Sequence, residues 1–182
     1  NIVEERTVGP DLGKDSIDAG VFSLIIGFIL VIMFMFIKYR IFGLVSNISL
    51  IANLFMMVGI LTMIEATLTL PGIAGIILTV GMAVDSNVLI YERIKEELKT
   101  EKSIIHAFDT GYNKAKITVI DANVTTLIAA AILFIFGSGP VKGFAVTLGI
   151  GIVTTLFSAY FIARHLTSVI VLNDKNGKYF KL

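Results

Sequence analysis

The 182-residue sequence contains no cysteine, and it has only two histidines and 16% charged residues. The absence of cysteine excludes disulfides, thiolate catalysis and cysteine-ligated metals. The two histidines, His106 and His165, lie outside the apolar runs, so the sequence offers little from which a metal site could be built. A formal net charge of +1 argues against a nucleic-acid partner.

Common catalytic and cofactor motifs are missing as well. There is no HExxH, no GxSxG and no Walker lysine in the chain. Gly149 and Gly151 do not form a nucleotide loop, because they lie inside an apolar run with no strand before it. The sequence therefore predicts a protein that is not an enzyme and that uses no cofactor.

Long apolar runs dominate what is present. Hydrophobic residues make up 55% of the chain, and the mean hydropathy is +0.88. No soluble domain of this size needs so much apolar surface, so the pattern predicts an all-α membrane protein. It predicts a bundle of five transmembrane helices, with spans at about 19–37, 42–64, 70–91, 117–136 and 144–163.

The remaining segments are polar or mixed. Residues 1–18 are predicted to be a connector that arrives from a water-exposed domain, and 167–182 to be a tail without a clear element. Beyond Tyr91 the helix is expected to continue over 92–99, and 103–116 to form a second amphipathic piece with Gly111 as a break. Both pieces are expected to lie along the membrane surface. A plain solvated connector is the alternative for 92–116.

Basic residues predict the orientation. If the chain starts outside, twelve of the 15 Lys and Arg residues fall on the cytoplasmic side: Lys38, Arg40, six in 92–116, Arg164 and three in the tail. The positive-inside rule then places the N-terminus outside and the C-terminus inside. Because the sequence opens at Asn1 without a signal peptide, we expect a fragment of a longer chain.

One carboxylate lies inside an apolar run. Asp85 precedes Tyr91, the end of its span, by six residues, which corresponds to about 9 Å of helix. A central Asp opposes insertion by about 2.5 to 3.5 kcal/mol, so this span needs neighbours that cover its polar face. Such a group is a candidate for proton or ion handling, and a structural Asp bonded to another helix is the alternative.

A short motif repeats around this acid. DSNV at 85–88 recurs as DANV at 121–124, which makes four proton-coupling candidates: Asp85, Asn87, Asp121 and Asn123. On antiparallel helices the two acids would lie at similar depth. Two acids that share a proton would also suit an aspartyl intramembrane protease, but the GxGD context typical of that class is absent. Alternatively, Asp121 caps the start of span 117–136.

No span contains a Lys or Arg that could neutralise Asp85, so it either carries a proton or meets a countercharge from a partner. Small residues at four-residue spacing predict where the last three spans pack and shield the acids. Those on span 117–136 include Thr118, Ala122 and Thr126. The other two spans contribute Gly75, Thr79, Ala83, Gly151 and Thr155. Asn53 is predicted to form an interhelical hydrogen bond.

Four runs carry a family resemblance: VEERTVGPDLGKDSI, VGMAVDSNVLIYERIKEEL, TVIDANVTTLIAAAILFIFGSGPVKGFAVTLGIGI and FSAYFIAR. Together they resemble the C-terminal membrane half of the SecD branch of the SecD/SecF family, accessory subunits of bacterial Sec protein export. The resemblance covers nearly the whole chain. Two small departures are Ser86, where the family often has Ala, and Asp11, where it often has Ser.

The resemblance implies a fold of the resistance-nodulation-division (RND) superfamily, of which this chain would hold helices two to six. It implies a bacterial inner-membrane protein that uses the proton motive force to move preproteins, with Asp85 as the proton-coupling acid. The implied partners are SecF with an intramembrane Arg, the SecYEG channel and YajC. Another RND-type exporter of lipid or small molecules, and a purely structural helix bundle, are the alternatives.

Overall fold

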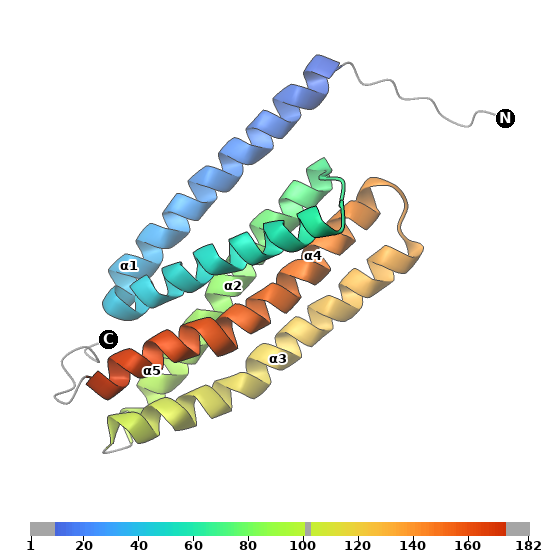
Figure 1. The fold of residues 1–182 in the computed structure, drawn as a ribbon. Helices are drawn as coiled ribbons and strands as arrows, with labels where there is room; N and C mark the ends of the chain where they lie inside the picture. Colours follow the sequence, from blue (N-terminus) through green and yellow to red (C-terminus); the bar gives the residue numbers. More distant parts are fainter. Residues whose placement is uncertain (1–9, 101–102, 174–182) are drawn as a thin grey trace.

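The computed structural model describes residues 10–100 and 103–173, and this part of the chain is helical, without strands (Figure 1). The first three helices are α1 (Pro10–Met63), α2 (Leu70–Glu97) and α3 (Ile104–Phe136). Helix α4 (Pro140–Phe157), the π-helix η1 (Ser158–Ala163) and α5 (Arg164–Asn173) then follow one another without a loop. The all-α membrane class is confirmed, since four helical stretches are long and apolar enough to cross a bilayer.

Helix α1 consists of two halves that meet at Arg40, where φ is 48° and ψ is −114°. The chain reverses there, and the two halves form an open hairpin (Figure 1). The turn is tight because Gly43 approaches the carbonyl of Met35 so closely that a Cβ would collide with it. The predicted spans 19–37 and 42–64 lie on either side of this turn.

The three prolines, Pro10, Pro71 and Pro140, all stand in the first turn of a helix. Proline suits this position because the first helical N–H groups have no acceptor within the helix. Helix α2 is also capped by Thr69, whose Oγ1 accepts a hydrogen bond from Gly72 N at 3.2 Å. These residues set where the helices begin.

Helix α2 is the centre of the bundle and packs against α1, α3 and α4. Its buried face includes Thr79, Ala83 and Ile90. The first half of α1 is different, because large apolar side chains such as Phe22 and Ile37 are exposed along it. An unburied apolar surface of this kind is suited to contact with lipid.

Helices extend into the segments predicted to be a connector and a tail. Helix α1 begins at Pro10, so residues 10–18 of the predicted connector are helical, and 1–9 lie outside the described residues. Helix α5 covers the start of the predicted tail, and 174–182 also lie outside the description. Apolar-to-polar boundaries in the sequence do not end these helices, because a helix can continue into water when its polar side chains are solvated.

Segment 92–116 does not form separate surface helices. Helix α2 runs on to Glu97, which confirms the expected continuation past Tyr91, and α3 runs without interruption from Ile104 to Phe136. The expected break at Gly111 was wrong: Gly111 is buried against α2, and a Cβ there would come within 2.7 Å of Ile94 Cα. This glycine allows two helices to approach closely instead of ending one of them.

Candidate functional site

The repeated motif places its acids and its amides on opposite sides of their helices. In α2, Asp85 is exposed while Asn87 is only 2% exposed. In α3, Asp121 is exposed while Asn123 is 6% exposed. Two residues along an α-helix correspond to about 200° of rotation, so an inward amide forces the acid outward.

Neither acid has a partner within the described residues. The carboxylates of Asp85 and Asp121 make no hydrogen bond or ion pair there, and exposed aliphatic side chains flank both. On α2 the neighbours are Leu78 and Leu89, at 46% and 44% exposure. The expectation that the last three spans shield the acids was therefore wrong, because α2 packs through its other face.

Asp121 does not cap a helix. Helix α3 begins at Ile104 with Ser103 as its N-cap residue, so Asp121 lies 17 residues inside the helix. The sequence-based alternative of a helix cap assumed that the span starts where the apolar run starts, and that assumption was wrong. An acid this far from the helix end gains nothing from the helix dipole, whose effect is confined to the terminal turn.

Glycine and threonine interlock at the contact between α2 and α4. A Cβ on Gly75 would collide with Thr147, and a Cβ on Gly151 would collide with Thr79. The two contacts advance by four residues on both helices, so α2 and α4 run parallel. Each threonine hydroxyl donates to a carbonyl of its own helix, from Thr79 to Gly75 O at 2.8 Å and from Thr147 to Phe144 O at 2.9 Å. This contact is therefore built on close packing.

The line of small residues on α3 lies elsewhere than expected. Thr118 and Ala122 are exposed and Thr126 is half-buried. The buried line of α3 instead includes Ala115, Val119, Asn123 and Ala130. The four-residue spacing occurs on more than one face of this helix, so spacing alone does not select the packed one.

Buried hydrogen bonds join the second half of α1 to the end of α4 and the start of η1. Asn53 Nδ2 donates to Thr155 Oγ1 at 3.1 Å, which confirms the predicted interhelical bond of Asn53. Ser49 Oγ donates to Ser158 O at 3.0 Å, at the start of the π-helix η1. Single π-turns inside α-helices often mark functional sites, and the sequence carried no signal for this one.

Four buried amides keep an acceptor without a partner. The side-chain oxygens that are buried and accept no hydrogen bond within the described residues are Asn47 Oδ1, Asn53 Oδ1, Asn87 Oδ1 and Asn123 Oδ1. A buried polar atom of this kind needs a hydrogen bond from a water molecule or from a donor group that moves toward it. The interior of the bundle therefore contains hydrogen-bonding capacity that its own side chains do not use.

Ion pairs and aromatic rings join the helices at the end that carries the α2–α3 connection. Tyr39 OH donates to Glu92 Oε1 at 2.8 Å, and the rings of Tyr39 and Tyr91 lie 5.7 Å apart. Lys114 Nζ lies 2.9 Å from Glu97 Oε1, and Glu97 is buried. Sequence reasoning missed these pairs because it treated 92–116 as a surface segment.

The chain is similar to known proteins over almost its whole length. The family described as "Protein export membrane protein SecD/SecF, C-terminal" matches residues 1–173. The protein translocase subunit SecD of Desulfurispirillum indicum is 56% identical over 172 residues, which are 94% of this chain and 33% of that subunit. SecD of Magnetococcus marinus is 52% identical over 174 residues, 96% of this chain and again 33% of that subunit.

A solved structure agrees. The crystal structure of SecDF, described as a translocon-associated membrane protein from Thermus thermophilus, matches with a TM-score of 0.87 and 44% identity. The match covers 91% of this chain and 23% of that one. The present chain therefore spans about a third or less of the proteins that it matches.

An all-helical bundle with buried polar contacts inside and two acids outside defines a multi-span α-helical membrane protein. Within that class, the chain belongs to the SecD/SecF family of protein export membrane proteins. The part of each SecD subunit that it matches is about a third of that subunit's length.

Proposed function

We propose that this chain is the membrane module of a SecD subunit, and that it couples proton entry to the movement of preproteins out of the bacterial cell. The module works through Asp85 and without covalent chemistry on a substrate, so it is not an enzyme. The observation that carries the proposal is the position of Asp85, a carboxylate inside the apolar run of α2, on an exposed face, with no partner among the described residues. We place it at membrane depth.

The physical argument begins with the cost of that position. A charged Asp near the bilayer centre is unfavourable by about 2.5 to 3.5 kcal/mol, so it must be protonated or paired. The face around it is apolar, with Leu78 and Leu89 exposed on either side. A helix of another subunit that carries a basic residue would cover the aliphatic side chains and pair with the acid. An intramembrane Arg of SecF is the partner that we propose.

The driving force is sufficient for a switch. One proton that crosses a potential of 100 mV releases about 2.3 kcal/mol, which biases a two-state equilibrium by about 50-fold. Protonation of Asp85 would weaken its pairing with the partner's Arg, and the two halves would shift relative to one another. Asp121 would be the second exposed acid of the repeated motif. Asn87 and Asn123 would supply the inward hydrogen-bond acceptors.

The setting follows from the family and from charge. We place the module in the bacterial cytoplasmic membrane, with its N-terminal end outside and its C-terminal end inside, as the distribution of basic residues favours. The proposed assembly contains SecF, the SecYEG channel and YajC. The similarity to SecD subunits and to a translocon-associated SecDF supports this assembly.

The test uses full-length protein in membrane vesicles with a preprotein substrate. Replacing Asp85→Asn removes the titrating group but keeps its size, so we expect the stimulation of export by the proton motive force to be lost. Asp15→Asn is the matched control, because Asp15 is an exposed acid of α1 far from the motif. Undiminished proton-dependent export by the Asp85→Asn variant would disprove the proposal.

A further inference from the structure

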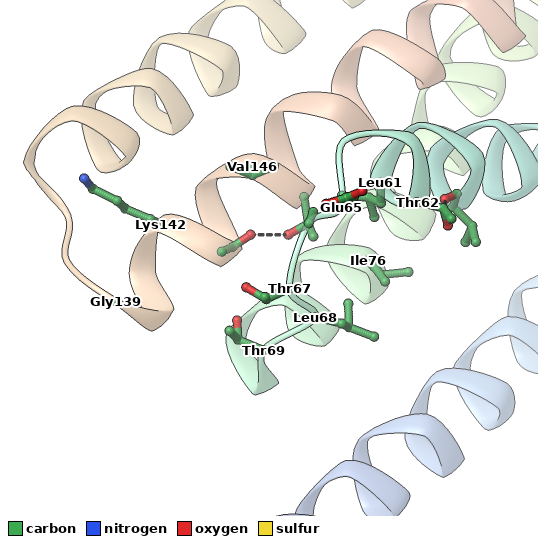
Figure 2. A pocket seen from close by; sticks show the side chains of 14 residues that line it. Leu61, Thr62, Glu65, Thr67, Leu68, Thr69, Ile76, Gly139, Lys142 and Val146 are labelled. Atoms are coloured by element: carbon green, nitrogen blue, oxygen red, sulfur yellow. Dashed lines mark hydrogen bonds between the residues drawn. The ribbon is translucent and has the colours of Figure 1, made fainter.

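A cavity of about 690 Å³ opens at the end of the bundle opposite the α2–α3 connection. It lies between the end of α1, the start of α2 and the start of α4 (Figure 2). This volume is within the range of ligand-binding cavities. Leu61, Ile76 and Val146 form apolar parts of its wall, and Glu65 and Lys142 are the charged residues that line it. The motif acids Asp85 and Asp121 do not line this cavity.

The lining of the cavity changes from polar to apolar along the helices. Val58 precedes Glu65 by seven residues, about 10 Å of helix, and Val146 follows Lys142 by four residues, about 6 Å. The charged residues stand where the apolar runs of α1 and α4 end, which is the headgroup level of a bilayer. The apolar wall then extends toward the hydrocarbon region. A ligand that fills this space is itself amphipathic.

Glu65 occupies a position that glycine normally fills. It follows α1 with φ at 52°, and the hydrogen bonds Glu65 N to Thr62 O (3.1 Å) and Ala66 N to Leu61 O (3.0 Å) form a Schellman motif. The left-handed conformation is unfavourable for a side chain with a Cβ. The helix would end more favourably with glycine, so a carboxylate is kept here at a cost in stability.

The two charges that line the cavity are not paired with each other. The Glu65 side chain makes no hydrogen bond or ion pair in the described part of the chain. Lys142 Nζ lies 5.9 Å from the centroid of the Phe134 ring, and Figure 2 shows its side chain directed away from Thr67 and Thr69. An exposed contact of this kind is weak, so the long lysine side chain can turn back toward the mouth of the cavity.

We propose that this cavity binds the headgroup of a phospholipid that carries a primary ammonium, phosphatidylethanolamine. Glu65 accepts hydrogen bonds from the ammonium, and Lys142 pairs with the phosphate. The upper parts of the acyl chains lie along Leu61 and Val146. A choline headgroup has no N–H to donate to Glu65, and an anionic lipid without an ammonium leaves the carboxylate without a partner.

The test is native mass spectrometry of full-length protein with phosphatidylethanolamine, phosphatidylcholine and phosphatidylglycerol in competition. We expect phosphatidylethanolamine to be retained about tenfold over phosphatidylcholine, as one charge-assisted hydrogen bond provides. Glu65→Gln and Lys142→Gln each reduce that preference. The double control Lys14→Gln with Asp15→Asn keeps it, since these two charged residues stand near the start of α1 and do not line the cavity. Equal retention of phosphatidylethanolamine and phosphatidylcholine by the unaltered protein would overturn the proposal.

Two further variants separate lipid binding from structure. Glu65→Gly relieves the left-handed strain, so the protein should melt at a higher temperature while the lipid preference is lost; a retained preference would overturn the proposal. A photo-cross-linking amino acid in place of Val146 should attach to lipid in native membranes. Attachment to another segment of the same full-length protein would show that protein fills the cavity, and would also overturn the proposal. Neither result depends on proton coupling at Asp85.

Discussion

The two faces of α2 differ in how their side chains are covered. One face, with Gly75, Thr79 and Ala83, is buried against α4 and interlocks with it. The other face, with Leu78, Asp85 and Leu89, is exposed and has an acid at its centre. The first face is complete within this chain. The second is not covered by the described part of the chain.

This difference shows how one helix can serve both folding and function. In a bilayer no hydrophobic gain drives helices together, so the closed face depends on small residues that allow close contact. In the proposed function, the open face carries a group that is unfavourable in lipid and therefore depends on a partner or a proton. Substitutions on the closed face should change stability, and substitutions on the open face should change coupling.

The largest stability loss is expected at the closed face. Even a single Cβ on Gly151 would lie only 2.9 Å from Thr79 Cβ, and Gly151→Val adds a larger, branched side chain there. The free energy of unfolding of full-length protein should therefore fall by about 1 to 3 kcal/mol. Gly149→Val is the matched control on the same helix, because its nearest contact is Leu127 Cδ1 at 4.0 Å. Thermal unfolding in detergent measures both variants. Equal losses would show that the interlock is not the source of stability.

A smaller loss is expected where α1 meets the π-helix. Ser49→Ala removes the hydrogen bond to Ser158 O and should destabilise the protein by about 0.5 to 1.5 kcal/mol. Ser46→Ala is the control, because Ser46 is equally buried but its Oγ has no partner within the described residues. That control should be neutral or stabilising in chemical unfolding. A loss for Ser46→Ala as large as for Ser49→Ala would contradict this account of the contact.

A weaker effect is expected at the ion pair between α2 and α3. Lys114→Ala leaves Glu97 with Arg93 at 3.5 Å as its remaining cation, so the loss should be about 1 kcal/mol or less and should shrink in high salt. Lys116→Ala, two residues along the same helix, is the control. The difference in unfolding temperature between the two variants, at low and high salt, tests this pair.

The smallest stability effect is expected on the open face. Asp85 has no partner within the described chain, so Asp85→Asn should leave the unfolding free energy within about 0.5 kcal/mol. Measured together with the export assay, this variant separates stability from coupling. A loss as large as that of Gly151→Val would show that Asp85 is structural after all.

Sequence reasoning succeeded where hydropathy or a single polar residue decides the outcome. The all-α membrane class follows from apolar runs of the right length, and the bond of Asn53 follows from the lack of other partners for an amide in a span. On α2 and α4 the line of small residues coincides with the contact, whereas on α3 it does not.

The other features could not be predicted from the sequence, because a helix that is apolar on all sides does not show which of its faces packs against protein. The outward position of Asp85 follows from how α2 packs. At the first residue of the π-helix, Ser158 O accepts a hydrogen bond from Ser49, which is 109 residues away along the chain. Gly111 is typical of a helix end by its residue type, and only the nearness of Ile94 shows that it serves a crossing. These features come from contacts between segments that are distant in the sequence.

The central claim is that Asp85 gains and loses a proton at membrane depth. Infrared difference spectroscopy of full-length protein with isotope-labelled aspartate, recorded between neutral and acidic pH, tests it directly. We predict a protonated-carboxyl band that is present in the unaltered protein and missing from the Asp85→Asn variant. Identical difference spectra from the two proteins would contradict the claim.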